Sequence, residues 1–211
     1  MVETVVHLVR HGEVHNPKKL LYGRLPDFHL SSRGRSMAAR TATSFKGKDV
    51  TYLAASPLER VQETAAPIAE VVGQDIQTNR DLIESGNVFE GLRTKGLRSQ
   101  LLNPIRWRHM TNPLKPSWGE PYAEILERML RAVDKARAEA EGHEAVLVSH
   151  QLPIVMVQRW AQGKRLPHNP ATRKCDLASV TTLVFEGDKL KSWSYSCLLY
   201  TSLSGLARQT V

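Results

Sequence analysis

The chain of 211 residues has few cysteines and no long apolar stretch, which are features that mark particular classes of protein. It holds two cysteines, Cys175 and Cys197, and no Cys-x-x-Cys pair, so the sequence indicates neither a secreted disulfide framework nor a cysteine metal site. No stretch reaches the roughly 20 consecutive apolar residues that a membrane-spanning helix needs, because polar residues interrupt the most apolar one, residues 145–157. A reducing compartment outside the membrane fits these absences.

The N-terminal residues carry neither a basic segment before an apolar run nor a small-residue cleavage site, so we expect no signal peptide and a cytoplasmic location. No repeat or low-complexity segment is visible. With 41% hydrophobic and 24% charged residues, the composition is that of an ordinary globular protein. We expect one domain over residues 1–211, which can bury about 70% of its unfolded surface without a stabilising metal.

Positive charge is in excess: 29 Lys and Arg residues against 21 Asp and Glu residues give a formal net charge of +8. This balance predicts an anionic partner, which the charge alone leaves open among a phosphorylated small molecule, nucleic acid and an acidic membrane surface. The basic residues are scattered, and no helix-turn-helix, RRM or zinc-finger signature is present. A nucleic-acid partner is therefore not favoured.

Strands and helices are expected to alternate along the chain. Short β-branched or apolar runs predict strands, and the spacing of apolar residues by three and four predicts helices. A helix is expected to start at Ser56 as N-cap with Pro57 in its first turn, and Pro67 is a candidate kink within it. The strands are expected at residues 4–9, 50–55 and 145–148, with a hairpin at 179–186 and 189–195, and the helices at residues 35–47, 58–72, 121–141 and 153–161.

This alternation predicts an α/β fold, a three-layer α/β/α sandwich with a mostly parallel central sheet. In such sheets ligands bind beyond the carboxyl ends of the strands. Polar and basic residues stand at three of these ends: Arg10-His11-Gly12, Ser56 with Arg60 one turn later, and Ser149-His150-Gln151. If the strands are parallel neighbours, two imidazoles and two guanidiniums converge at one rim and form an anion site.

Each of these residues also has a simpler interpretation. His11 is, taken alone, an ordinary loop histidine, and Arg60 is a solvated helix residue paired with Glu59 or Glu63. His7, His11 and His15 recur every four residues, as in a metal-binding helix. A strand at residues 4–9 argues against that metal site, because spacing by four does not bring three strand side chains around one ion.

Six segments, in order, resemble the histidine phosphatase superfamily, which includes the cofactor-dependent phosphoglycerate mutases. They are LVRHGEVHN (8–16), LSSRG (30–34), SPLERVQETA (56–65), LIESGNVFEG (82–91), WGEPYAEILERM (118–129) and VLVSHQ (146–151). The resemblance implies a phosphoglycerate mutase-like fold and a metal-independent, cofactor-free phosphoric monoester hydrolase of the histidine acid phosphatase type. It implies that His11 is the nucleophile, that Arg10, Arg60 and His150 hold the phosphoryl oxygens, that Glu84 donates a proton and that Asn16 adds a phosphate contact.

The implied roles agree with general chemistry. A neutral His11 can attack phosphorus and form a phosphohistidine that water then hydrolyses. Arg10, Arg60 and a protonated His150 would stabilise the charge on the transferring group. A carboxyl group with a raised pKa can protonate the leaving oxygen; Glu84 is the first candidate and Glu90 the second.

The sequence departs from the family at two places. Gln151 stands where a glycine commonly follows the second histidine, so its side chain is expected to line and narrow the substrate pocket. Pro121 stands where a serine is common. Both changes bear on the choice of substrate, and neither removes a group that the chemistry needs.

Residues 85–118 lack periodicity and form an irregular insertion, which often covers the active site in this family. Arg106 and Arg108, with neighbouring tryptophans, predict a lid that binds an anionic substrate with a ring or apolar part. A basic surface loop is the simpler alternative. Residues 198–211 match no motif.

Three functions remain open, and hydrolysis of a phosphorylated small molecule is favoured. A phosphoglycerate mutase-type transfer is the second, although the longer basic insertion of the glycolytic mutases is not found. A non-catalytic anion-binding regulatory module is the third. It is disfavoured because none of the five groups in the proposed chemistry is missing: Arg10, His11, Arg60, Glu84 and His150.

Overall fold

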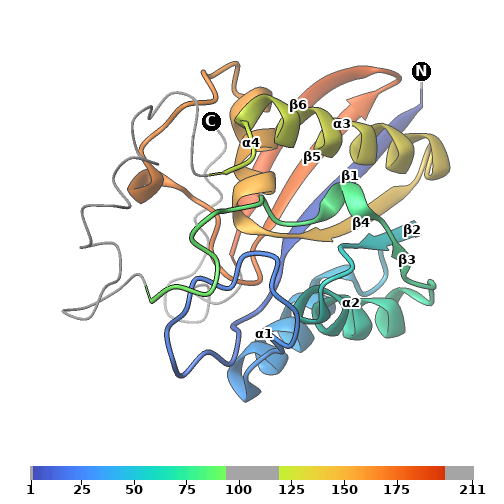
Figure 1. The fold of residues 1–211 in the computed structure, drawn as a ribbon. Helices are drawn as coiled ribbons and strands as arrows, with labels where there is room; N and C mark the ends of the chain where they lie inside the picture. The colour runs from blue at the N-terminus through green and yellow to red at the C-terminus, as the bar shows by residue number, and fades with distance from the viewer. Residues whose placement is uncertain (1, 94–118, 198–211) are drawn as a thin grey trace.

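A computed structural model describes residues 2–93 and 119–197 and shows a mixed sheet of six strands in the order β3-β2-β4-β1-β5-β6. Helices lie on both faces of the sheet, which confirms the predicted α/β sandwich (Figure 1). The strands are β1 (Glu3–Arg10), β2 (Val50–Ala55), β3 (Gln77–Thr78), β4 (Glu144–Ser149), β5 (Val180–Glu186) and β6 (Lys189–Ser196). The α-helices are α1 (Ser32–Ala42), α2 (Glu59–Val72), α3 (Tyr122–Glu139) and α4 (Gln151–Ala161).

Strands β3, β2, β4 and β1 run parallel, whereas the β5–β6 hairpin pairs with β1 in the antiparallel sense. The hairpin turns at Gly187, whose positive φ of 58° suits a residue without a Cβ. Because β1, β2 and β4 are parallel, their carboxyl ends lie at the same edge of the sheet. The loops that follow them gather at that edge (Figure 1).

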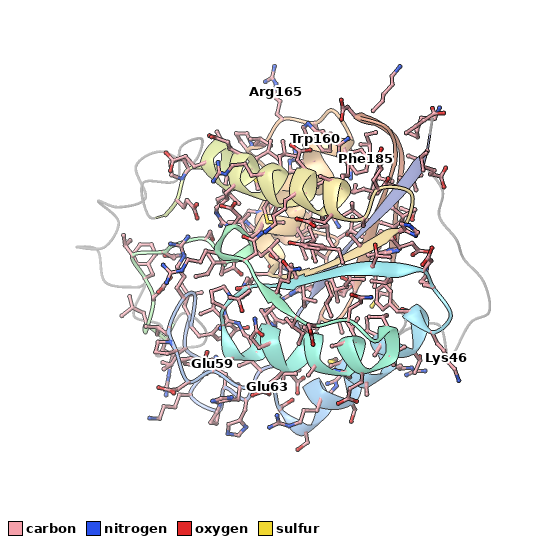
Figure 2. All side chains as sticks on the ribbon, turned by 90° about the vertical axis from the view of Figure 1, so that its right-hand side faces the viewer. Lys46, Glu59, Glu63, Trp160, Arg165 and Phe185 are labelled. Carbon is pink, nitrogen blue, oxygen red and sulfur yellow. The ribbon has the colours of Figure 1, made fainter. Side chains whose placement is uncertain are left out.

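Two hydrophobic cores lie on the two faces of the sheet. In β4, Ala145 and Leu147 belong to the core under α3 and α4, while Val146 and Val148 belong to the core over α1 and α2. This division follows from the strand period of two. Figure 2 shows Trp160 and Phe185 in the layer of α3 and α4, and both contribute to its core. Because helices cover both faces of the central strands, β2 and β4 read as nearly continuous apolar runs, whereas the edge strand β6 alternates between exposed and half-buried residues.

Helix α3 has the predicted amphipathic pattern. Ile125, Met129, Val133 and Ala136 are spaced by four, four and three residues and are all buried. This spacing places them on one side of the helix, against the sheet. The predicted helix is therefore confirmed, and it ends before Gly142 as expected.

The predicted start of α2 is wrong. Its N-cap is Leu58, without a side-chain cap, and the helix begins at Glu59. The Ser56 hydroxyl instead lies 2.8 Å from His150 Nε2, so this side chain is committed to another partner. The helix continues through Pro67. Ser56 is therefore not the N-cap of α2.

None of the helices in the described part of the chain is long and apolar enough to cross a membrane. Arg106, Arg108 and most of the predicted insertion at residues 85–118 lie outside the described residues, as do residues 198–211.

Candidate active site

His11 and His150 lie side by side because β1 and β4 are paired in register. Arg10, the last residue of β1, is opposite Ser149, the last residue of β4. The next residue of each strand is a histidine, and the two imidazole centroids are 5.3 Å apart. The backbone N–H of His11 also donates to the Ser149 carbonyl over 3.1 Å. The parallel sheet thus brings together two segments that are far apart in sequence.

The turn after His11 requires glycine. A Cβ at Gly12 would lie 2.6 Å from the carbonyl oxygen of Gly34, which is backbone of α1 and cannot move aside. The Gly12 N–H donates to the Thr64 hydroxyl on α2 over 3.1 Å. The Gly12 carbonyl is 2.8 Å from His11 Nδ1. Because a carbonyl only accepts, Nδ1 carries the ring proton and the lone pair of the neutral ring is on Nε2.

The pKa of His11 is held well below its usual 6.5. Burial is the largest cause, followed by the positive charges of Arg10 and Arg60, and the bond to Gly12 opposes them. The imidazole is therefore neutral at neutral pH. A buried neutral histidine beside two guanidiniums has a lone pair available for bond formation.

Arg10 and Arg60 bring positive charge to this site, and each has guanidinium N–H groups without a hydrogen-bond partner in the described structure. Arg10 Nη1 donates to the Cys175 carbonyl over 2.6 Å, and Arg60 Nη2 donates to the Gly23 carbonyl over 2.6 Å. Within the described structure, Arg10 Nε and Arg60 Nε and Nη1 are buried without a hydrogen-bond partner. Unsatisfied buried donors on a cation are costly, and an anion that supplies acceptor oxygens offsets this cost.

The alternative interpretation of Arg60 as an ion-paired surface residue does not hold. Arg60 is fully buried. Glu63 instead accepts from His29 and Arg35, and Glu59 accepts from the Asp27 N–H at 3.5 Å. Figure 2 shows both glutamates on α2, near the periphery of the molecule.

The surroundings of His150 determine its protonation in the free site. His150 is fully buried, and its pKa is held well below 6.5, first by burial and also by the positive charges of neighbouring arginines such as Arg60. Its Nδ1 lies 3.4 Å from Arg60 Nη2, which can only donate, so Nε2 carries the ring proton and donates to Ser56 Oγ. His150 is therefore neutral in the free site, and the protonated His150 expected beside a transferring phosphoryl group stays a prediction. Protonation would require the negative charge of a bound ligand.

Glu84 lies at the same edge of the sheet, in the loop before α3. Its Oε1 accepts from the Ser85 N–H over 2.9 Å, and burial raises its pKa above the usual 4.5. Its carbonyl accepts from Arg24 Nε over 2.7 Å. A buried carboxyl with a raised pKa retains its proton to higher pH and can act as an acid.

The loop that carries Glu84 is fixed by a network around Glu120. Both Arg24 and Arg128 donate to the Glu120 carboxylate, and Arg128 also donates to the Asp81 carbonyl. Glu90, the second candidate acid, has a different partner: its Oε1 accepts from the Asn87 N–H over 3.2 Å. Glu90 does not line the cavity beside His11.

A cavity of about 830 Å³ opens beside these groups. Among the predicted site residues, Arg10, His11, Asn16, Glu84 and Gln151 line it. The other lining residues in the described part of the chain are Lys19, Leu20, Leu21, Tyr22, Gly23, Ser85, Gly86, Asn87, Gly119, Glu120, Tyr122, Leu152, Pro170 and Arg173. The volume is that of a small-molecule site and exceeds what a phosphate group alone would fill.

Arg60 and His150 lie deeper in the protein than the residues that line the cavity. Both are fully buried and do not line the cavity. The Tyr22 ring covers the guanidinium of Arg60, with Cζ 4.8 Å from the ring centroid. Arg10 thus borders the cavity directly, whereas the Tyr22 ring lies over Arg60.

Asn16 and Gln151 both line the cavity, but part of each amide is already engaged. The Asn16 amide bonds with both the carbonyl and the N–H of Leu20, which closes its own loop. Gln151 Nε2 lies 3.4 Å from the Cys175 carbonyl, which also accepts from Arg10. Gln151 therefore lies on the cavity wall, and that it narrows the pocket stays a prediction.

Sequence reasoning did not single out Tyr22, Lys19 or Arg173. They come from irregular loops, where no periodicity or motif marks a residue. A weak signal exists for Arg173, which precedes the buried Cys175 by two residues in a segment rich in basic side chains.

The alternative metal site at His7, His11 and His15 is not assembled. His7 forms hydrogen bonds with Thr182 of β5 and Glu144 of β4, and His15 is exposed. No group of three or more potential metal ligands was found among residues 2–93 and 119–197.

Comparison with protein families gives a match over almost the whole described chain. A model of the histidine phosphatase superfamily, branch 1, matches residues 6–196. An uncharacterized protein of Mycobacterium tuberculosis is 52% identical over 194 residues, which are 92% of this chain and 96% of the relative. A probable phosphoglycerate mutase of Escherichia fergusonii is 31% identical over 183 residues, 81% of this chain and 84% of the relative.

Solved structures share the fold. YhfR of Bacillus stearothermophilus superposes with a TM-score of 0.75 at 23% identity, covering 89% of this chain and 94% of that one. A mycobacterial glucosyl-3-phosphoglycerate phosphatase gives a TM-score of 0.71 at 20% identity, covering 92% and 97%. At these identities the similarity concerns the architecture of the chain.

Proposed function

The chain belongs to the histidine phosphatase superfamily, branch 1, and on this premise we propose that it hydrolyses a phosphate monoester through a phosphohistidine at His11. Members of the superfamily are phosphatases or mutases. The proposal assigns no step to a metal ion.

One observation carries the proposal: His11 is a buried neutral imidazole on the cavity wall, with Nδ1 bonded to the Gly12 carbonyl. This bond leaves the lone pair on Nε2 and fixes the plane of the ring. Arg10, on the same wall, has an Nε without a partner in the described structure and can hold a phosphoryl oxygen. A fixed nucleophile beside a fixed cation is what in-line phosphoryl transfer requires.

The proposed reaction has two steps. In the first, His11 Nε2 bonds to phosphorus as the ester P–O bond breaks, and the leaving alkoxide takes the proton of Glu84. In the second, a water attacks phosphorus and gives a proton to the Glu84 carboxylate. The P–N bond then breaks, releasing phosphate and restoring neutral His11. Glu84 alternates as acid and base, a role that its raised pKa suits.

Arg60 and His150 are proposed to bind the same phosphoryl group once the Tyr22 ring moves from the Arg60 guanidinium. Arg60 Nε and Nη1 have no partner in the described structure, so a phosphoryl oxygen would satisfy donors that are otherwise buried at a cost. The approach of a dianion also raises the pKa of His150, because the negative charge favours the imidazolium. His150 then becomes a second donor to the phosphoryl oxygens.

A mutase is the second candidate, because a 31% identical relative is a probable phosphoglycerate mutase. A mutase transfers the phosphoryl group from His11 back to the substrate instead of to water. Interconversion of 2- and 3-phosphoglycerate faster than release of inorganic phosphate would establish that activity. The phosphatase is preferred because the longer basic insertion of the glycolytic mutases is not found in this sequence.

The test is hydrolysis of p-nitrophenyl phosphate in excess EDTA by the wild type, His11→Ala and His15→Ala. We expect EDTA to leave the rate unchanged and His11→Ala to lower it by at least about a thousandfold. His15 is exposed and serves as the matched control. A phosphoenzyme that is labile to acid and absent from His11→Ala would identify the intermediate. Hydrolysis that survives in His11→Ala would contradict the proposal.

A further inference from the structure

Arg173 lies on the cavity wall apart from the residues proposed to handle the phosphoryl group. It follows the 3-10 helix Pro170–Thr172 and precedes Cys175, whose carbonyl accepts from Arg10 over 2.6 Å. The loop of Arg173 is thus bonded directly to the guanidinium beside His11. Arg173 is half-buried and lines the same cavity as Arg10, His11 and Glu84.

Neutral groups hold the guanidinium of Arg173 in place. Its Nε donates to His168 Nε2 over 2.9 Å, and its side chain also bonds with Tyr122. His168 Nδ1 lies 2.8 Å from the Leu166 carbonyl, so Nδ1 carries the proton and Nε2 is the acceptor. Burial lowers the pKa of His168, which keeps the ring neutral. The Tyr122 and His168 rings are in contact, with centroids 5.6 Å apart.

These partners orient Arg173 without neutralising it. Across residues 2–93 and 119–197, Arg173 takes part in none of the ion pairs within 4 Å. The other carboxylate on the wall besides Glu84 is Glu120, which is already paired with Arg24 and Arg128. A partly desolvated cation without a counter-ion is costly, and a bound anion removes the cost.

Glu84 links this cation to the proposed chemistry. Glu84 lines the same cavity as Arg173 and Arg10. If Glu84 protonates the leaving oxygen, the leaving group lies beside it, and the remainder of that group extends into the space that Arg173 borders.

We propose that Arg173 binds a carboxylate on the leaving group, so that the substrate is a small phosphate monoester of a hydroxy acid. This inference rests on the proposed phosphatase function. One guanidinium matches the single charge and the two coplanar oxygens of a carboxylate. A second phosphate group would place nearly two negative charges beside the single guanidinium of Arg173. The first phosphate group, in contrast, has two guanidiniums, those of Arg10 and Arg60.

The experiment compares substrates that differ by the carboxylate alone. Phosphoserine is paired with phosphoethanolamine, and 3-phosphoglycerate with glycerol phosphate. The quantity measured is the ratio of kcat/KM within each pair, for the wild type, Arg173→Gln and Lys174→Gln. Lys174→Gln removes the same charge from the adjacent residue, whose side chain is exposed and does not line the cavity.

We expect the kcat/KM of the wild type to be about tenfold or more higher for the carboxylate compound in at least one pair. The compound without a carboxylate cannot form the charge-assisted hydrogen bond with Arg173. Arg173→Gln should abolish this preference, and Lys174→Gln should retain it. Calorimetric binding of the same pairs gives the same comparison without turnover, so the subsite is tested even if hydrolysis is absent.

Three results would overturn the inference while leaving the proposed function intact: p-nitrophenyl phosphate hydrolysis with no carboxylate preference, equal losses in the two variants, or a preference for bisphosphates that Arg173→Gln abolishes. Absence of hydrolysis of every monoester, with carboxylate-dependent binding retained, would instead contradict the phosphatase and keep the subsite.

Discussion

The Ser56 hydroxyl lies 2.8 Å from Nε2 of His150, and this contact joins the ends of two adjacent parallel strands. The Ser56 N–H donates to the Val148 carbonyl of β4, which fixes the position of Ser56 next to the strand that carries His150. On its other side, His150 Nδ1 faces Arg60 Nη2 at 3.4 Å. The tautomer of a buried histidine is thus determined by one hydroxyl and one guanidinium.

Ser56→Ala is expected to leave His150 Nε2–H without an acceptor. A buried unsatisfied donor costs about 1–3 kcal/mol, so the free energy of unfolding should fall by that order. We also expect kcat to fall by about tenfold, since the imidazole loses its fixed tautomer. Urea denaturation and steady-state kinetics measure the two effects. Ser36→Ala is the control: its hydroxyl bonds with the Ser32 carbonyl on the exposed side of α1. Similar losses in both variants would contradict a specific role for Ser56.

Glu84→Gln is expected to remove the alkaline limb of the pH profile. Burial raises the pKa of Glu84 above 4.5, so the proton that the leaving group needs is present below that raised pKa and is lost as pH rises through it. We expect kcat for alkyl phosphates to fall by about 10²–10⁴-fold. The loss should be smaller for p-nitrophenyl phosphate, whose leaving group needs little protonation. Glu90→Gln should keep the wild-type profile; loss of the alkaline limb there would make Glu90 the acid.

The acid limb of the profile is expected below pH 6.5. The pKa of His11 is lowered by burial and by two arginine charges, so the nucleophile stays neutral until pH falls through that lowered value. Hydrolysis of p-nitrophenyl phosphate, measured as kcat/KM between pH 4 and pH 8, should therefore remain high in mildly acidic solution. A fall in rate with a midpoint at or above 6.5 would contradict a neutral buried His11.

Glu144→Gln is expected to lower stability at neutral pH. Glu144 Oε2 bonds with His7 Nε2 at 2.6 Å and with Lys48 Nζ at 2.8 Å, and these partners hold its pKa at about 2. Because the folded pKa is below the usual 4.5, the stabilisation is present above pH 4.5 and is lost as pH falls toward 2. We expect Tm to fall by about 2–4 °C at pH 7 and by less at pH 3.

Thermal unfolding of Glu144→Gln and the wild type at the two pH values measures this difference. Glu127→Gln provides the control, because Glu127 forms an exposed pair with Arg131 one helical turn away, and such pairs contribute little. A Tm difference of equal size at pH 7 and pH 3 would show that the carboxylate charge of Glu144 is not the cause.

Gln151→Ala is expected to widen the cavity at the start of α4. The variant removes the amide that lies on the wall 3.4 Å from the Cys175 carbonyl. We expect kcat/KM for naphthyl phosphate to rise several-fold relative to that for phenyl phosphate. An unchanged ratio would show that Gln151 does not limit the substrate's size.

Much of the fold follows from local pattern. The β-branched run at residues 4–9 and the apolar run at 145–148 predict strands that are buried on both faces, and the three-and-four spacing along α3 predicts which side of that helix is buried. Burial of apolar surface is the dominant favourable term in folding, so such patterns are strong predictors of elements. The short β3 was missed because it has no apolar pattern, and the start of α2 was misplaced because Ser56 bonds with His150 instead of capping the helix.

The positions of Arg10, His11 and His150 at strand ends follow from the sequence, because these polar residues come at or directly after the ends of the apolar runs. Which strand ends lie next to each other depends on the folded sheet. The pairing of Arg10 with Ser149 brings the two imidazoles together, the Tyr22 ring covers Arg60, and Arg173 reaches the cavity from a distant loop. These relationships depend on register and on packing between remote segments, and no local pattern of residues encodes them.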